Sequence, residues 1–296
     1  MAKKRVIPTQ KKLQLTRTSG SSSNFTLIDV GKVLSQQNRR LYRQGRNYRC
    51  KVELIDDNEQ SNHSVYVLSD TWVNHLAWKK AFEAYMNATK EEREMLGPRV
   101  ARWNDFRVKT GFTVPGGVPD YAPVVYDPTG SAQTLNVGEF NLSTVELDAG
   151  DKEFSWGAGS PTEFGILEEL EKAFNTEASP QIIEVNQPYS DIDGDQMNLD
   201  QFVELQEEGD QPPYDSTNFP DPWVRIDVLR SNLASGGKRA TDWFNAPCGF
   251  IIVQTSAGGD DTKNVELTVA SGDYKGVMAP SMGVAKLTPD KKYIVK

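Results

Sequence analysis

Residues 38–55 read NRRLYRQGRNYRCKVELI, and this stretch joins a dense group of arginines to the start of a β-strand. From position 48 to position 54, Tyr, Cys, Val and Leu alternate with Arg, Lys and Glu. A period of two is typical of a strand that has one buried face and one exposed face. The stretch therefore predicts a half-buried strand that five arginines precede or interrupt.

Similar strand signals recur along the chain between turn-forming runs such as VPGGVPDY and SAGGDD. About eight strands joined by long, irregular connections favour an all-β fold, an eight-stranded antiparallel sandwich, over an alternating βαβ sheet. Besides residues 48–54, the predicted strands are 65–68, 102–108, 134–147, 181–185, 223–229, 249–253 and 265–270.

Helical patterns interrupt the strands after the second predicted strand. Residues 69–88, SDTWVNHLAWKKAFEAYMNA, place aromatic and alanine side chains on one arc, with charged side chains opposite. Thr89 and Glu92 form a possible capping box for a short helix that ends at Gly97. A third helix is predicted over residues 161–174.

Charge is distributed unevenly along the 296 residues, whose formal net charge is −8. Residues 1–52 contain thirteen Lys or Arg and one acid, Asp29, whereas the remainder contains 20 basic and 40 acidic residues. The stretch 173–224 alone contains twelve acids and no Lys or Arg, which predicts long, acidic, exposed loops. This asymmetry predicts a basic segment for a polyanion on a body that repels it.

The N-terminal part of the chain has few large apolar side chains up to about residue 24, where TSGSSSN adds a polar tract. Such a segment cannot bury enough surface to offset the entropy of ordering, so we expect a mobile arm. The predicted organisation is a basic arm over residues 1–37 and one shell-like β domain over residues 38–296.

Basic residues of the arm and of the arginine-rich stretch are the candidate binding residues. The planar guanidinium group binds phosphate bidentately, and Tyr42 and Tyr48 could stack on the bases of a flexible single strand. A solubility tail and a solvated strand face are the structural alternative. The candidates are Lys3, Lys4, Arg5, Lys11, Lys12, Arg17, Arg39, Arg40, Arg43, Arg46 and Arg49.

Few residues point to metal or catalytic chemistry. Two cysteines and two histidines at unsuitable spacings exclude a structural zinc site and a disulfide framework. The alternating Asp191, Asp193 and Asp195 resemble part of a calcium loop, but Gln196 and Phe202 stand where that motif needs Gly and Glu. We expect no cofactor, no catalytic site and, without a run of about 20 apolar residues, no membrane span.

The layout of the chain resembles that of a viral protein family. The segments that carry the likeness are QNRRLYRQGRNYRCKVELID, DTWVNHLAWKKAFEAYMNATKEERE, ARWNDFRV, TDWFNAPCGFIIVQT and VELTVASGDYKGVMAP. They resemble the jelly-roll capsid proteins of small circular single-stranded DNA viruses that also encode a replication initiator, such as the smacovirus-like and pecovirus-like groups.

This resemblance implies an eight-stranded jelly roll with a helical insertion after the second strand. It also implies self-assembly into an icosahedral homo-oligomeric shell, with the candidate cations facing a packaged single-stranded DNA genome. The expected location is the virion, and the host nucleus during assembly, where AKKRV resembles an import signal. A host receptor would be a further partner, which the sequence does not identify.

Two other functions fit the sequence. The first is a monomeric β-sandwich module that binds nucleic acid or carbohydrate. The second is a metal-dependent enzyme that uses the carboxylates of residues 191–200. The size of the purified protein separates the shell protein from the monomeric module.

Overall fold

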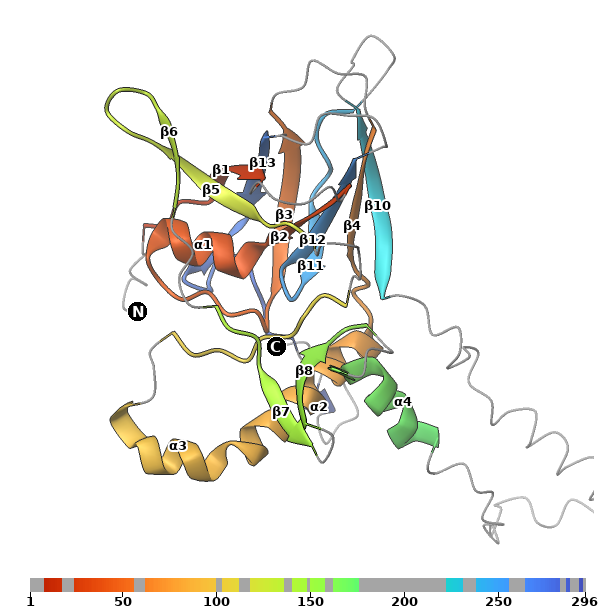
Figure 1. Cartoon of the computed structure of the whole chain (residues 1–296). Coiled ribbons are helices and arrows are strands. Elements are labelled where there is room, and N and C mark those ends of the chain that lie inside the picture. The colour runs from red at the N-terminus through yellow and green to blue at the C-terminus, as the bar shows by residue number, and fades with distance from the viewer. Residues whose placement is uncertain are drawn as a thin grey trace, which may run out of the picture.

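The computed structural model describes residues 8–17, 24–55, 62–99, 103–111, 118–135, 140–147, 150–157, 162–175, 222–230, 238–255, 264–282, 286–287 and 293–294. Two antiparallel sheets make up its main body, and most of the helices gather with short strands at one end of them (Figure 1). The predicted β-rich, antiparallel character of the chain is therefore confirmed.

The larger sheet has six strands, and the smaller one has four. In spatial order, the larger sheet contains β11 (Phe244–Pro247), β3 (Asn47–Leu54), β13 (Asn264–Val269), β1 (Lys12–Arg17), β5 (Tyr121–Tyr126) and β6 (Ala132–Thr134). The smaller sheet contains β10 (Trp223–Arg230), β4 (Asn62–Leu68), β12 (Phe250–Thr255) and β2 (Phe25–Asp29).

The eight strands β1–β4 and β10–β13 pair in a nested pattern. β1 pairs with β13, β2 with β12, β3 with β11 and β4 with β10, so the first strand meets the last and the pairing closes inward. The ladders between β3 and β13 and between β4 and β12 join these pairs into the two sheets. All of these ladders are antiparallel.

Inward-facing side chains of both sheets form the main core. Tyr48, Cys50 and Val52 of β3 are fully buried, and they belong to one apolar cluster with Ile251 and Val253 of the smaller sheet. Apolar surface removed from water contributes about 25 cal/mol per Å², so this shared interior is the main force that holds the sheets together. The alternation predicted for residues 48–54 is confirmed.

Helix α1 (Val30–Asn38) follows β2 directly. The carboxylate of Asp29 caps it by accepting a hydrogen bond of 2.9 Å from the backbone N–H of Lys32. The helix buries Val30, Val33 and Leu34 in the main core. It ends at Arg39, whose left-handed backbone (φ 50°) turns the chain toward β3.

Between β4 and β10, the chain adds β5 and β6 to the larger sheet and otherwise forms a mixed insertion that lies below the sheets in Figure 1. Its second core joins Trp78, Phe106, Phe154 and Trp156 to Phe250 of β12. The insertion contains α2 (Trp72–Ala88), α3 (Lys90–Leu96), a 3-10 turn (Gly97–Arg99), β7 (Thr144–Leu147), β8 (Gly150–Ser155), β9 (Glu163–Gly165) and α4 (Ile166–Asn175). Two short hairpins complete the described elements: β14 (Ser271–Gly272) with β15 (Gly276–Val277), and β16 (Lys286–Leu287) with β17 (Tyr293–Ile294).

The N-terminal part of the chain differs from the expected arm. Residues 12–17 form β1, between β13 and β5, and their side chains Leu13 and Leu15 are buried in the main core. Residues 25–38 form β2 and α1. The expectation failed here because the polar residues that alternate with Leu13 and Leu15 made the segment resemble a solvated tail, although every second side chain is buried.

Three further expectations change in detail. Residues 103–108 are not a strand, because Asp105 and Arg107 are buried beside Phe106 and make side-chain contacts in place of a ladder. The range 134–147 divides between β6 and β7, and the predicted strand 181–185 lies outside the described residues. The helical insertion follows the fourth strand, because β1 and β2 precede the first strand that was predicted.

Candidate nucleic-acid interface

The loop between α1 and β3 brings the central arginines of the sequence to one end of the sheets. Arg39 closes α1, and the N–H of Arg40 donates to the carbonyl of Ser35 at 3.3 Å. Cations are favourable near the last turn of a helix, where the carbonyl ends leave partial negative charge. Residues 41–46 then lead directly into β3.

Lys275, in the turn between β14 and β15, joins this group of arginines. Burial and the positive charges of Arg40, Arg43 and Arg46 lower the pKa of the Lys275 amine below its usual value. Burial is the larger cause of the lowered pKa, and the contribution of the three guanidinium groups shows that positive charges are close together here. We call Arg40, Arg43, Arg46 and Lys275 the cation cluster.

Aromatic and polar contacts hold the cation cluster in place. The Arg46 guanidinium lies 4.0 Å from the centre of the Tyr274 ring, and its Nη1 donates to the carbonyl of Ala279 at 3.3 Å. Arg43 Nη1 lies 3.0 Å from the Asp105 carboxylate. These contacts leave 52% of the Arg43 side chain exposed, so it still meets solvent.

Most of the described candidate residues have no carboxylate within ion-pairing distance in the described part of the chain. The exceptions are Arg43 and Lys12, which lies 2.8 Å from Glu266, while Arg17 is 8% exposed and largely withdrawn from solvent. The residues without such a partner are Lys11, Arg39, Arg40, Arg46 and Arg49. Lys3, Lys4 and Arg5 lie outside the described residues.

The predicted stacking of bases on Tyr42 and Tyr48 is wrong. Tyr42 is 1% exposed and Tyr48 is 0% exposed, because both rings belong to the main core. Their hydroxyl groups donate to the backbone carbonyls of Lys275 and Arg43, at 3.0 Å and 2.7 Å. The two tyrosines therefore brace the loop that carries the cation cluster.

Sequence reasoning missed three residues that the structure brings close to candidate cations. Lys275 has no local signal, since only the fold brings it to residues 40–46. Lys51 shares the outward parity of Arg49 on β3, so the period-two pattern of residues 48–54 already contained it. Trp243 precedes β11 and is 43% exposed, which only the structure shows.

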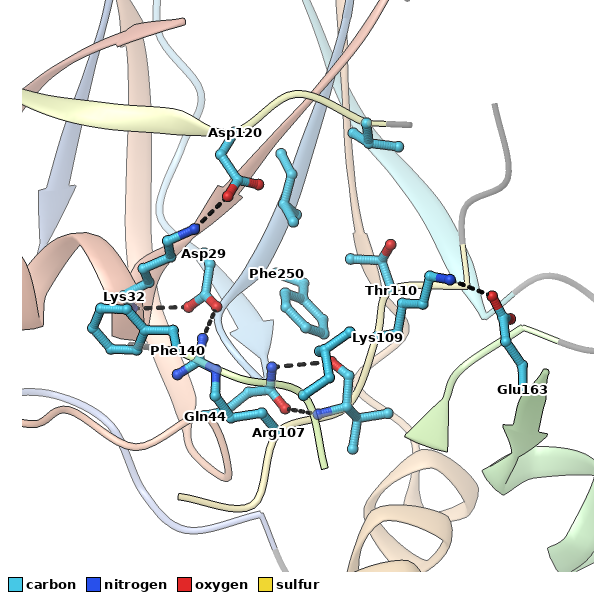
Figure 2. Close-up of a pocket in the computed structure, with 14 residues that line it drawn as sticks. Asp29, Lys32, Gln44, Arg107, Lys109, Thr110, Asp120, Phe140, Glu163 and Phe250 are labelled. Atoms are coloured by element: carbon cyan, nitrogen blue, oxygen red, sulfur yellow. Dashed lines mark hydrogen bonds and ion pairs between the residues drawn. The ribbon is translucent and has the colours of Figure 1, made fainter. Parts of the chain in front are cut away.

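A separate polar pocket of about 400 Å³ lies where α1 and β2 meet the insertion. Figure 2 shows Asp29 bonded to both Arg107 and Lys32, and a second contact between the Lys32 amine and Asp120. On its far side, Lys109 lies 2.6 Å from Glu163. Each cation of this pocket is thus paired with its own carboxylate.

This pairing distinguishes the polar pocket from the cation cluster. Arg107 is 4% exposed and Asp29 is 6% exposed, so neither charge would be stable without the other. Gln44 adds a two-way link to Val108, with its amide accepting at 2.7 Å and donating at 3.1 Å. The pocket carries no net charge from these pairs and ties the insertion to the sandwich.

The structure contributes two findings on metals and membranes. Within the described ranges, no group of three or more His, Cys, Asp or Glu side chains is placed to hold a metal ion. The candidates Asp191, Asp193 and Asp195 lie outside those ranges. No helix in the described part of the chain has the length and apolarity needed to cross a bilayer.

The buried pair between Asp29 and Arg107 gives a stability prediction. Asp29→Asn keeps a good helix cap but removes the charge, so we expect the free energy of unfolding to fall by about 3–5 kcal/mol. Glu83→Gln, in an exposed pair 3.8 Å from Lys79, should cost no more than about 0.5 kcal/mol. Urea unfolding of both variants measures the difference, and equal losses would contradict the assigned role of the buried pair.

Comparison with known proteins assigns the chain to no family. It matches no protein-family model, no curated protein and no solved structure. The function must therefore be inferred from the residues and from the geometry that brings them together.

Proposed function

We propose that the chain is a structural jelly-roll protein that assembles into an icosahedral shell around a single-stranded DNA genome. The nested pairing of β1–β4 with β10–β13 supports the jelly roll, because that fold is a long hairpin wound into two sheets of four strands. In this view β5 and β6 extend one sheet, and the insertion is an addition at its end. The proposed role needs no catalytic residue and no cofactor.

The observation that carries the proposal is a set of cations that have no carboxylate partner among the described residues, in a chain of net charge −8. Arg40 and Arg46 lie together with Lys275, although the approach of these charges is unfavourable in the isolated subunit. A polyphosphate strand would convert this repulsion into attraction. Phosphate attraction is common to DNA and RNA, so the family resemblance alone selects DNA.

A monomeric module that binds nucleic acid or carbohydrate is the second candidate. Jelly rolls occur in lectin domains as well as in viral shells, and a fold alone does not decide between such functions. The exposed Trp243 favours this candidate, because sugar rings bind to exposed aromatic surfaces. The two proposals differ in the assembly state that they require.

Particle size tests the shell proposal directly. We expect the purified full chain to form uniform particles in negative-stain images and light scattering, several-fold larger than a monomer with a radius of gyration of about 19 Å. A chain that remains monomeric from low to high salt, with or without oligonucleotide, would overturn the shell and favour the module.

Neutralising the cation cluster tests the cargo. Arg40→Gln and Arg46→Gln remove two members of the cluster, and Arg39→Gln removes the cation next to it. Together these changes should make the salt dependence of oligonucleotide binding less steep, by about 2 in the slope of log K against log salt, since each lost phosphate contact removes about 0.7. Arg43 is left unchanged because it pairs with the buried Asp105. The matched control, Lys79→Gln, Lys80→Gln and Lys90→Gln on α2 and α3, carries the same change of charge. An equal slope in the two triple variants would remove the cluster from cargo binding.

The pKa of Lys275 offers a test without mutation of the arginines. Its amine pKa is lowered by burial and by three guanidinium groups, and a bound phosphate strand would favour the charged amine. We therefore expect the Lys275 pKa to rise when a saturating oligonucleotide is added. NMR of ¹³C-methylated lysines measures it, with Lys275→Arg identifying the signal. An unchanged pKa at saturation would place the phosphates elsewhere.

A further inference from the structure

An exposed tryptophan stands on the six-stranded sheet near several cations. Trp243 retains 43% of its surface in contact with solvent, although the burial of a large aromatic side chain usually stabilises a fold strongly. It lies between Thr241, whose N–H donates to Val52 at 2.9 Å, and Phe244, which pairs with Cys50. This register places Trp243 beside Lys51 of β3.

The same register aligns cations across the outer face of the sheet. Lys12 of β1 is opposite Thr268 of β13, and Thr268 is opposite Lys51. Arg49 precedes Lys51 by two positions on β3, so its side chain points to the same face of the sheet. It lies about 7 Å from Lys51 along the strand. Cross-strand neighbours are about 4.8 Å apart, so these side chains form a short array that leads to Trp243.

A groove of about 510 Å³ accompanies this array. Trp243, Lys11 and Lys12 line it together with residues 268–271. Its volume lies within the range of about 300–1,000 Å³ that is typical of small-ligand sites. Lys11 Nζ lies 2.6 Å from the Ser271 hydroxyl, which holds the amine at the groove without neutralising it.

The cations around the tryptophan are mostly available to a ligand. Arg49 contacts the amide oxygen of Asn245 at 3.2 Å, and within the described residues neither Arg49 nor Lys51 forms an ion pair. Lys12 is paired with Glu266, but 66% of its side chain is exposed. A neutral sugar would gain little from such charges, whereas a phosphate strand would gain from each of them.

We propose that an unpaired base of a single-stranded nucleic acid stacks on Trp243 while its neighbouring phosphates bind Lys11, Arg49 and Lys51. The inference rests on the proposed function, because its ligand is the same strand. A positively charged groove combined with an aromatic platform is the general solution for binding single strands independently of sequence. The outer face of the six-stranded sheet then binds the nucleic acid, in addition to the basic side chains of the N-terminal segment.

Two strands of equal charge separate stacking from phosphate binding. Fluorescence anisotropy would compare labelled oligothymidylate with an abasic strand of the same length, using the full chain below its assembly concentration. Trp243→Ala should weaken oligothymidylate binding on the order of 10-fold and leave abasic binding unchanged, as expected for one lost stacked base. Trp243→Phe should retain most of the affinity.

Trp72→Ala is the matched control, because Trp72 at the start of α2 is 59% exposed and does not line the groove. It should bind both strands as the parent chain does. Lys51→Gln should weaken binding of both strands equally, since it contacts phosphate.

Three results would overturn the inference. Stacking would be excluded if Trp243→Ala bound oligothymidylate as tightly as the parent chain, or if it lost the same affinity for both strands. In either case, salt-dependent binding of both strands would still support the packaging proposal. Binding of a neutral maltooligosaccharide that Trp243→Ala abolishes would assign the groove to carbohydrate. Failure of the parent chain to bind either strand would instead overturn the proposed cargo itself.

Discussion

The two ladders of β3 are the constraint on which the proposed interface depends. This strand pairs with β13 on one side and β11 on the other, so its register cannot slip without breaking both. A slip of one residue would also turn Tyr48, Cys50 and Val52 from the core to solvent. Because side chains alternate, the burial of these three residues obliges Arg49 and Lys51 to face outward.

Arginine serves two opposite purposes in this chain. Arg107 is withdrawn from water and depends on Asp29 for its charge, so it contributes to the joint between insertion and sandwich. Arg46 lies on the Tyr274 ring, which orients its guanidinium without neutralising it. Only the second arrangement leaves a charge that can exchange water for phosphate at small cost.

The sequence predicted those elements whose pattern and burial agree. The strands predicted over residues 48–54 and 265–270 closely match the observed β3 (Asn47–Leu54) and β13 (Asn264–Val269). The sequence did not predict β1, because its charged residues resemble those of a solvated tail, although every second side chain is buried. Tyr42 was misassigned for the converse reason, since a polar aromatic side chain among arginines shows no local sign of burial. Lys275 could not be placed, because only tertiary structure brings it to the arginines.

The pairing of β1 with β13 also has a consequence for biosynthesis. Lys12 and Thr268 are partners although 256 residues separate them in the chain. At about 5–20 residues per second, the ribosome releases the last strand roughly 10–50 s after the first. The nascent polypeptide therefore cannot complete its larger sheet until β13 (Asn264–Val269) has been synthesised. In the proposed shell, contacts between copies that require this sheet are thereby delayed until β13 of each copy has been synthesised.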